Sequence, residues 1–249
     1  IHGSSGQKGE VPALSLLTLL SDAAGELGFA HQPSAIFTST DPTHAVLRIL
    51  ASKEGKELAR RFDWQILQAE GTFTTVAAET QVAAVTTTFP NFGHIINGTM
   101  WNRTQNRIIR GPLTPAEWQQ KKAATAQITI GNYHRIRGGA LLFFSTPTAG
   151  DSIFFEYISN KWCQSSALAA QSDWAADSDT ALIDEEIIRL GVIWRYRKAK
   201  GFDYGEDFRT YEMALQDIFG PDAGKSIVDM TGTEDLGIGV NLAEGSWSL

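Results

Sequence analysis

The chain has 249 residues, of which 43% are hydrophobic and 20% charged, and its formal net charge is −7. These values are ordinary for a globular protein that buries a sizeable core in one large domain or two small ones. The acidic balance argues against a nucleic-acid reader, and no apolar run approaches the roughly 20 residues that a membrane span needs. The single cysteine, Cys163, excludes an intrachain disulfide.

The first ten residues look foreign to the fold. They contain Gly3-Ser4-Ser5-Gly6 and no starting methionine. Such a stretch is typical of a leader or a tag. We therefore expect residues 1–10 to be a leader or tag, and the fold to begin near Val11.

Residues 11–69 are predicted to be helical. The apolar residues of 14–24 predict a short helix, which Gly25 and Gly28 end. Asp41-Pro42 predicts the start of a longer helix, because aspartate caps helices and proline is favoured at the first position. Apolar residues then keep a helical period, which predicts a helix continuing to about Leu67.

From Gly71 on, β-favouring residues replace the helical period. Strand-like pairs of residues flank Asn97-Gly98, a two-residue hairpin signal. Residues 140–145 and 152–158 flank a turn-rich loop and predict a second antiparallel hairpin. Between them, Thr114-Pro115-Ala116-Glu117 is a capping box that predicts a short helix. Residues 70–159 are therefore predicted to form a small, mainly β domain.

The C-terminal third returns to helix. Acidic residues at 184–186 and basic residues at 195–200 match the dipole of one helix, and Gly201 is its predicted stop. A second helix over about 204–219, ended by Gly220-Pro221, follows after a short link. Residues 160–221 thus predict a helical hairpin.

The helix over about 180–200 is apolar on two sides. One broad stripe can face the domain core. Ile188, Val192 and Tyr196, spaced four apart, fall on a different side. Such a helix is either central in its domain or packed on a partner, and the pattern favours neither alternative. In the second alternative, Ile188, Val192 and Tyr196 are a candidate subunit interface.

Residues 222–249 combine glycines with apolar residues that follow no period. A flexible tail would carry fewer apolar residues, although it remains the alternative. We expect an extended C-terminal arm that orders against another surface. Its candidate contact residues are Ile227, Val228, Met230, Leu236, Ile238, Val240, Leu242 and Trp247.

No pattern points to catalysis. The five histidines lack metal-ligand spacing, and Cys163 beside Trp162 is expected to be a buried, unreactive thiol. Glu156, in a predicted strand among aromatic residues, is the one carboxylate to consider for a hydrolase. We expect a protein that is not an enzyme, with no catalytic residue, no cofactor and no metal.

Arginines give the predicted β domain some positive charge. With neighbouring aromatic residues they are a candidate nucleic-acid or glycan surface. Solvated strand faces with salt bridges are the simpler and preferred interpretation. The arginines are Arg103, Arg107, Arg110, Arg135 and Arg137.

The order of several short segments is distinctive. Phe62-Asp63-Trp64-Gln65 runs into residues 71–76, where the long helix gives way to the first strand. Residues 139–143, 147–150 and 155–159 form the second strand-rich segment, and Tyr196-Arg197-Lys198-Ala199 precedes the turn of the helical hairpin. In this order the chain resembles, over about residues 12–220, the head-to-tail adaptor (connector) proteins of tailed bacteriophages, especially the tail tubular protein A type.

The resemblance implies a helical bundle with an inserted β domain. The expected fold is therefore α+β: a helical core of residues 11–69 and 160–221, an inserted small antiparallel β domain of 70–159, and an extended C-terminal arm of 222–249.

The resemblance also implies a structural virion protein of the phage neck or tail, assembled in the host cytoplasm. Its copies would form a ring, usually dodecameric, beneath the portal. The implied partners are the portal protein, neighbouring copies, the next tail protein (nozzle or tail tube), and DNA that passes through the ejection channel without sequence-specific binding. The resemblance also implies that the C-terminal arm contacts the portal or a neighbouring subunit. No membrane is implied.

Two other functions remain as alternatives. One is a tail or capsid accessory module whose β domain binds a glycan. The other is a cell-wall hydrolase attached to a tail, with Glu156 as its carboxylate.

Overall fold

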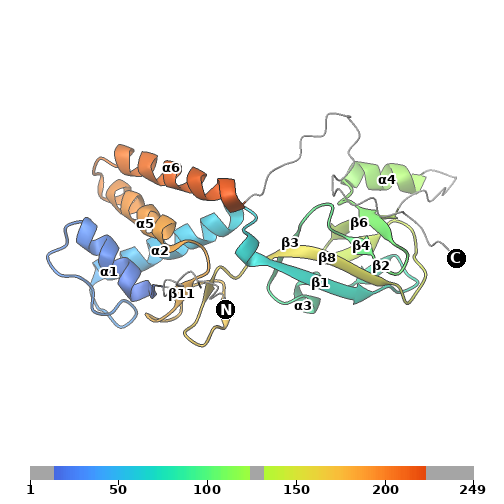
Figure 1. Ribbon diagram of the computed structural model, residues 1–249, viewed down its shortest axis with the longest axis horizontal. Helices are drawn as coiled ribbons and strands as arrows, with labels where there is room; N and C mark the ends of the chain where they lie inside the picture. Colours follow the sequence, from blue (N-terminus) through green and yellow to red (C-terminus); the bar gives the residue numbers. More distant parts are fainter. Residues whose placement is uncertain (1–13, 124–131, 223–249) are drawn as a thin grey trace, which may run out of the picture. The chain divides into compact units, whose positions relative to one another are not determined.

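The computed structural model describes residues 14–123 and 132–222, which form an α+β protein of two compact units (Figure 1). Residues 14–66 and 161–222 make the first, which we call the helical unit. Residues 67–160 make the second, which we call the sheet unit. Along the chain, the sheet unit interrupts the helical unit.

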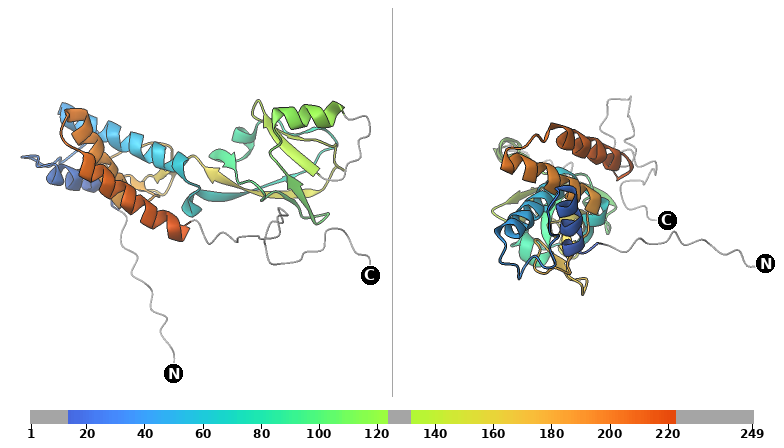
Figure 2. Two further views of the ribbon diagram at one scale, coloured as in Figure 1. Left: turned by 90° about the horizontal axis from the view of Figure 1, so that it is seen from above. Right: turned by 90° about the vertical axis from the view of Figure 1, so that its left-hand side faces the viewer.

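Four helices form the helical unit, with α5 in contact with the other three (Figure 2). They are α1 (Leu16–Glu26), α2 (Pro42–Arg61), α5 (Glu185–Lys200) and α6 (Gly205–Asp222). The central position of α5 explains why its sequence is apolar on two sides.

Capping residues define the ends of these helices. Asp41 caps α2 as predicted, because its carboxylate accepts a hydrogen bond of 2.8 Å from the Thr43 amide. Gly201 ends α5 as predicted, in the left-handed conformation with φ +76°. Two predicted ends are wrong: α2 stops at Arg61 rather than about Leu67, and α6 runs through Gly220-Pro221 to Asp222.

The early stop of α2 has a visible cause. The indole Nε1 of Trp64 donates a hydrogen bond of 2.9 Å to the carbonyl of Leu58. The last carbonyls of a helix have no partner inside it, so an outside donor favours termination there. Trp64 is buried in the process.

A second, small sheet completes the helical unit, and the sequence did not predict it. Its strands are β9 (Cys163–Gln164), β10 (Ala170–Gln171) and β11 (Thr180–Ala181), in the order β10-β9-β11. Cys163 is fully buried here, and burial raises the pKa of its thiol to about 12. The prediction that Cys163 is buried is confirmed, and its low reactivity stays a prediction that the raised pKa supports.

The sheet unit is built on one eight-stranded mixed sheet in the order β1-β8-β4-β5-β6-β7-β2, with β3 also paired to β8. The strands are β1 (Gln68–Thr74), β2 (Thr80–Val82), β3 (Phe92–Ile95), β4 (Trp101–Asn102), β5 (Arg107–Arg110), β6 (Asn132–Arg137), β7 (Ala140–Phe143) and β8 (Ser152–Ser159). All pairs are antiparallel except β5 with β6. The unit also contains the helices α3 (Val85–Thr88) and α4 (Pro115–Ala123), of which α4 follows β5. The short 3-10 helix η1 (Gln65–Leu67) directly precedes β1 in the chain.

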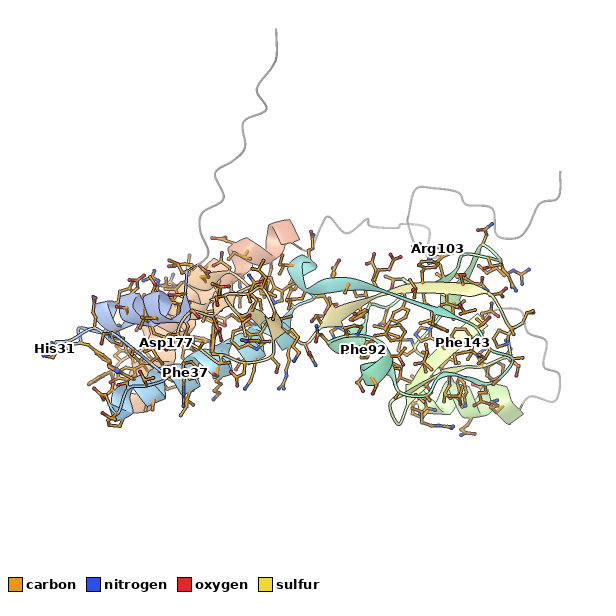
Figure 3. All side chains as sticks on the ribbon, turned by 90° about the horizontal axis from the view of Figure 1, so that it is seen from below. His31, Phe37, Phe92, Arg103, Phe143 and Asp177 are labelled. Carbon is orange, nitrogen blue, oxygen red and sulfur yellow. The ribbon has the colours of Figure 1, made fainter. Side chains whose placement is uncertain are left out.

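Aromatic side chains fill the core of the sheet unit. Phe89 meets Phe155 edge to face, with ring centroids 4.9 Å apart, and Phe92 lies 5.5 Å from Tyr157. Such ring pairs add to the free energy of burial. Figure 3 shows Phe92 and Phe143 among the side chains of this unit, and Arg103 at its surface.

The predicted helical bundle with a small inserted β domain is wrong, because the eight-stranded sheet is the dominant element. Several of its strands are only two to four residues long. Strands this short show little alternation, so each looked like an isolated piece rather than part of one sheet.

Both predicted hairpins are also wrong. β3 and β4, on either side of Asn97-Gly98, do not pair with each other but lie one after the other along β8. β7 pairs with β6 and β2, while β8 pairs with β1, β3 and β4. The two-residue turn that does form a hairpin is Gly138-Gly139, with φ of +59° and +80°, between β6 and β7.

The capping box before α4 is confirmed. The Thr114 amide donates to the Glu117 carboxylate at 2.8 Å, and the Glu117 amide donates to the Thr114 hydroxyl at 3.3 Å. This local pattern folds as predicted because both partners lie within one turn. None of the helices in 14–123 and 132–222 combines the length and apolar character needed to cross a membrane.

Candidate binding groove

The candidate subunit interface predicted on α5 is buried inside the helical unit. Ile188 and Val192 are fully buried, and Tyr196 nearly so, with its ring 5.3 Å from that of Phe29. These three side chains therefore offer no surface to a second subunit. The helix has two apolar sides because it is central in its own unit.

The residues predicted for the C-terminal arm, from Ile227 to Trp247, lie outside the described residues. Their expected contacts with a portal or neighbour stay a prediction.

Glu156 lies on the exposed face of β8. Its cross-strand neighbour is Glu70 of β1, whose carboxylate binds Arg103 at 2.6 Å. Arg103 in turn covers the Phe154 ring at 3.6 Å. This cluster fits the solvated strand face with salt bridges that we preferred over a ligand surface. Within 14–123 and 132–222, no three His, Cys, Asp or Glu residues are grouped to hold a metal ion.

The helical unit carries an open groove of about 740 Å³ along the outer face of α2. Arg48, Ser52, Lys56 and Arg60 follow each other at four-residue spacing, so they form one stripe on that face. Ile49, Lys53 and Glu57 form the neighbouring stripe, and Phe37, Asp173 and Trp174 supply the walls. This basic stripe was not predicted, although its four-residue spacing is visible in the sequence.

Hydrogen bonds to loop carboxylates hold the walls of the groove. Asp177 accepts hydrogen bonds from the amides of Ile36, at 3.1 Å, and Phe37, at 3.0 Å, and Figure 3 shows Phe37 beside Asp177. Asp179 likewise accepts from the amides of Ala175 and Ala176. The Phe37 and Trp174 walls are therefore fixed before any ligand arrives.

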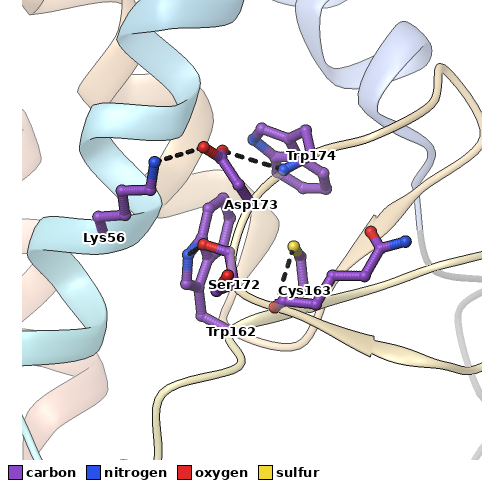
Figure 4. Close-up of polar contacts among 7 residues, drawn as sticks. Lys56, Trp162, Cys163, Ser172, Asp173 and Trp174 are labelled. Atoms are coloured by element: carbon purple, nitrogen blue, oxygen red, sulfur yellow. Dashed lines mark hydrogen bonds and ion pairs between the residues drawn. The ribbon is translucent and has the colours of Figure 1, made fainter.

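Trp162 supports the Trp174 wall of the groove from behind (Figure 4). Trp162 donates to the carbonyl of Ser172 at 2.8 Å, and its ring meets that of Trp174 edge to face at 4.8 Å. Asp173, between them, binds Lys56 of α2. Burial would raise the pKa of Asp173, but hydrogen bonds with Lys56 and Ser52 outweigh this effect and lower it.

The groove has an excess of positive charge. Arg48, Lys53, Lys56 and Arg60 give four cations against the two carboxylates of Glu57 and Asp173. Both carboxylates are already bound, Asp173 by Lys56 and Glu57 by Arg195 at 2.9 Å. Lys53 and Arg60 are exposed, and neither forms an ion pair within the part of the chain that the structure describes. A ligand for this groove must therefore supply acceptors.

A buried ion pair lies under the groove. Glu54 of α2 is 0% exposed and binds Nε of Arg195, which is 8% exposed. Burial raises the pKa of Glu54, although Tyr211 and Arg195 oppose the shift. Gly191 makes the contact possible, because a Cβ there would lie 2.3 Å from the Glu54 carboxyl carbon.

Gly55→Ala is expected to destabilise the helical unit by about 2 kcal/mol, the range of overpacked cores. A Cβ at Gly55 would lie 2.2 Å from the ring of Trp162, which is 1% exposed and tied to Ser172. Urea unfolding followed by labelling of Cys163 measures the change, since this single, buried thiol reacts only when the helical unit opens.

Gly25→Ala is the matched control for this substitution. It also changes a glycine inside a helix, but its Cβ would meet only the flexible end of Gln32, at 3.0 Å. The better helix propensity of alanine should leave the unit unchanged or up to about 1 kcal/mol more stable. Equal effects of the two substitutions would contradict the close Gly55–Trp162 packing.

The sequence matches no model of a known protein family, and comparison with curated proteins finds no similar sequence.

Proposed function

We propose that the chain is a structural head-to-tail adaptor subunit of a tailed phage. The observation that carries the proposal is the order of the parts that resemble this family. Residues 62–76 take the chain from the end of α2 into β1, and residues 139–159 take it from β7 to β8. The α5–α6 hairpin then follows. In this function the subunit joins a ring beneath the portal, conducts DNA and provides a platform for tail attachment.

The proposed activity is binding, without a chemical step. Since Ile188, Val192 and Tyr196 are buried, contacts between subunits must use other surfaces. Phe202 and Phe208, both exposed around the α5–α6 turn, supply apolar area of the kind that interfaces use. The net charge of −7 suits a wall along which DNA passes without sticking.

Deletion of residues 223–249 is expected to abolish binding to the portal ring of the same phage. The apolar residues of this segment are the proposed contacts of the arm. Negative-stain electron microscopy of the two proteins, mixed, measures the added ring of density. Circular dichroism and protection of Cys163 from labelling show whether the shortened chain is folded.

A chain with residues 223–249 in scrambled order is the control, because it keeps length and composition. It should also fail to bind, since the contacts need the order of the residues. Full binding by the folded, shortened chain would refute the role of the arm. Absence of any ring with the intact chain would refute the adaptor proposal itself.

A further inference from the structure

The α2 groove makes specific demands on whatever fills it. Lys53 and Arg60 are exposed donors that need acceptors, and Ile49, one turn before Lys53, is an exposed apolar side chain, 60% accessible. A partner must therefore combine carboxylates or phosphates with apolar groups. A simple anion would leave Ile49 in water.

A single-stranded nucleic acid fits the groove poorly. Such strands bind on exposed aromatic faces along an uninterrupted basic track. Here Trp174 is buried, and the Phe37 ring is covered by the Arg48 guanidinium at 4.8 Å. Glu57 and Asp173 also place negative charge beside the basic stripe. An acidic polypeptide with apolar residues meets these demands better.

Residues 225–249 of this chain have that composition. Asp229, Glu234, Asp235 and Glu244 stand against the single cation Lys225, a side-chain charge of −4 + 1 = −3. The groove, with four cations and two carboxylates, has 4 − 2 = +2. Apolar residues such as Ile227, Val228 and Met230 lie between the acidic ones. Charge and apolar character are therefore complementary between the two.

The segment starts within reach of the groove. α6 ends beside the end of α2, where the Phe219 ring stacks on Phe62 with centroids 4.6 Å apart. Arg60, at one end of the groove, is two residues before Phe62. The seven residues from Asp222 to Asp229 extend to roughly 24 Å, which is ample for Asp229 to meet Arg60.

The spacing along the segment also matches the groove. From Arg60 to Arg48, α2 rises by about 18 Å. In an extended chain, Asp229 and Glu234 lie up to roughly 17 Å apart. With Asp229 at Arg60, an extended segment antiparallel to α2 passes Lys53 and brings Glu234 and Asp235 to the far end, near Arg48.

We propose that residues 225–249 dock in the α2 groove of the same chain, with their carboxylates on Lys53, Arg60 and Arg48 and their apolar side chains on Ile49. The proposal goes beyond the adaptor function and holds whether or not the chain joins a portal. It gives the segment an intramolecular binding site, from which any outside partner must displace it.

Photo-crosslinking of the full-length chain tests the docking. Ile49→p-benzoylphenylalanine places the probe in the groove, and Met213→p-benzoylphenylalanine is the control, at 58% exposure on the outer face of α6. Mass spectrometry should find crosslinks from position 49 to residues 225–249 at the mass of a single chain, at least tenfold above those from position 213.

Charge reversal in the groove is the second part of this test. Lys53→Glu with Arg60→Glu should lower the yield of this crosslink at least tenfold. Arg107→Glu with Arg209→Glu changes the net charge equally at exposed sites outside the groove and should leave the yield unchanged. No crosslink to 225–249, a crosslinked dimer, or a bound nucleic acid at position 49 would each overturn the proposal.

Discussion

Arg195→Met is expected to destabilise the helical unit by about 3–5 kcal/mol, the cost of leaving a buried charge without its partner. The substitution keeps most of the side-chain volume but removes the guanidinium that binds Glu54. Glu54 is 0% exposed, so water cannot replace the lost partner. Urea unfolding, followed by labelling of Cys163, measures the loss.

The penalty of Arg195→Met should shrink as the pH falls. Without Arg195, burial raises the pKa of Glu54 further, so the folded state takes up a proton before the unfolded state does. A raised folded-state pKa gives a contribution to stability that is fully present below the unfolded pKa, and that is lost as the pH rises through the folded pKa. The variant should therefore be less destabilised at pH 5 than at pH 7.

Two variants control this experiment. Arg209→Met makes the same replacement at an exposed position of α6, and surface changes usually stay within about 0.5 kcal/mol. Glu54→Leu combined with Arg195→Met removes both charges and should recover most of the stability. An effect of Arg195→Met no larger than that of Arg209→Met would show that the pair is not buried.

The sheet unit is expected to lose about 3 kcal/mol of stability between pH 6.5 and pH 4 through His134 alone. His134 of β6 is 1% exposed, and burial lowers the pKa of its ring from 6.5 to about 4, although backbone hydrogen bonds with Ile109 and Arg110 oppose the shift. Below pH 6.5 the His134 ring is protonated in the unfolded chain but stays neutral in the folded chain. Stability is therefore full above 6.5 and falls as the pH approaches 4.

His134→Gln should flatten this pH dependence, because glutamine does not titrate. Pulse proteolysis in urea, followed through peptides of 67–160, measures the sheet unit alone. His31→Gln makes the same replacement outside the sheet unit, at an exposed position of the helical unit, and should keep the slope. A slope in His134→Gln equal to that of the unchanged chain would disprove the burial of a neutral His134.

The sequence by itself determined the local features of this fold. The Asp41 cap, the Thr114–Glu117 capping box and the Gly201 stop each depend on residues within one helical turn, so the sequence predicts them directly. The burial of Cys163 followed from its apolar neighbours.

Only the tertiary structure decided how the strands pair. β8 pairs with β1 across about 85 residues of sequence and with β3 and β4 on its other edge, contacts that no local turn signal encodes. The sequence Asn97-Gly98 favours a hairpin, but both flanking strands, β3 and β4, pair instead with β8, which is longer than either. The sheet is therefore larger than its short strands suggested.

The tertiary structure also decided between the two alternatives for α5 and revealed the groove. Ile188, Val192 and Tyr196 gave the same pattern for a central helix as for an interface, and only the positions of α1, α2 and α6 around α5 resolve it. The α2 groove joins residues 37, 48–60 and 173–174, which are far apart in the sequence. Periodicity reports which face of a helix is apolar, whereas the packing of the other elements decides what covers that face.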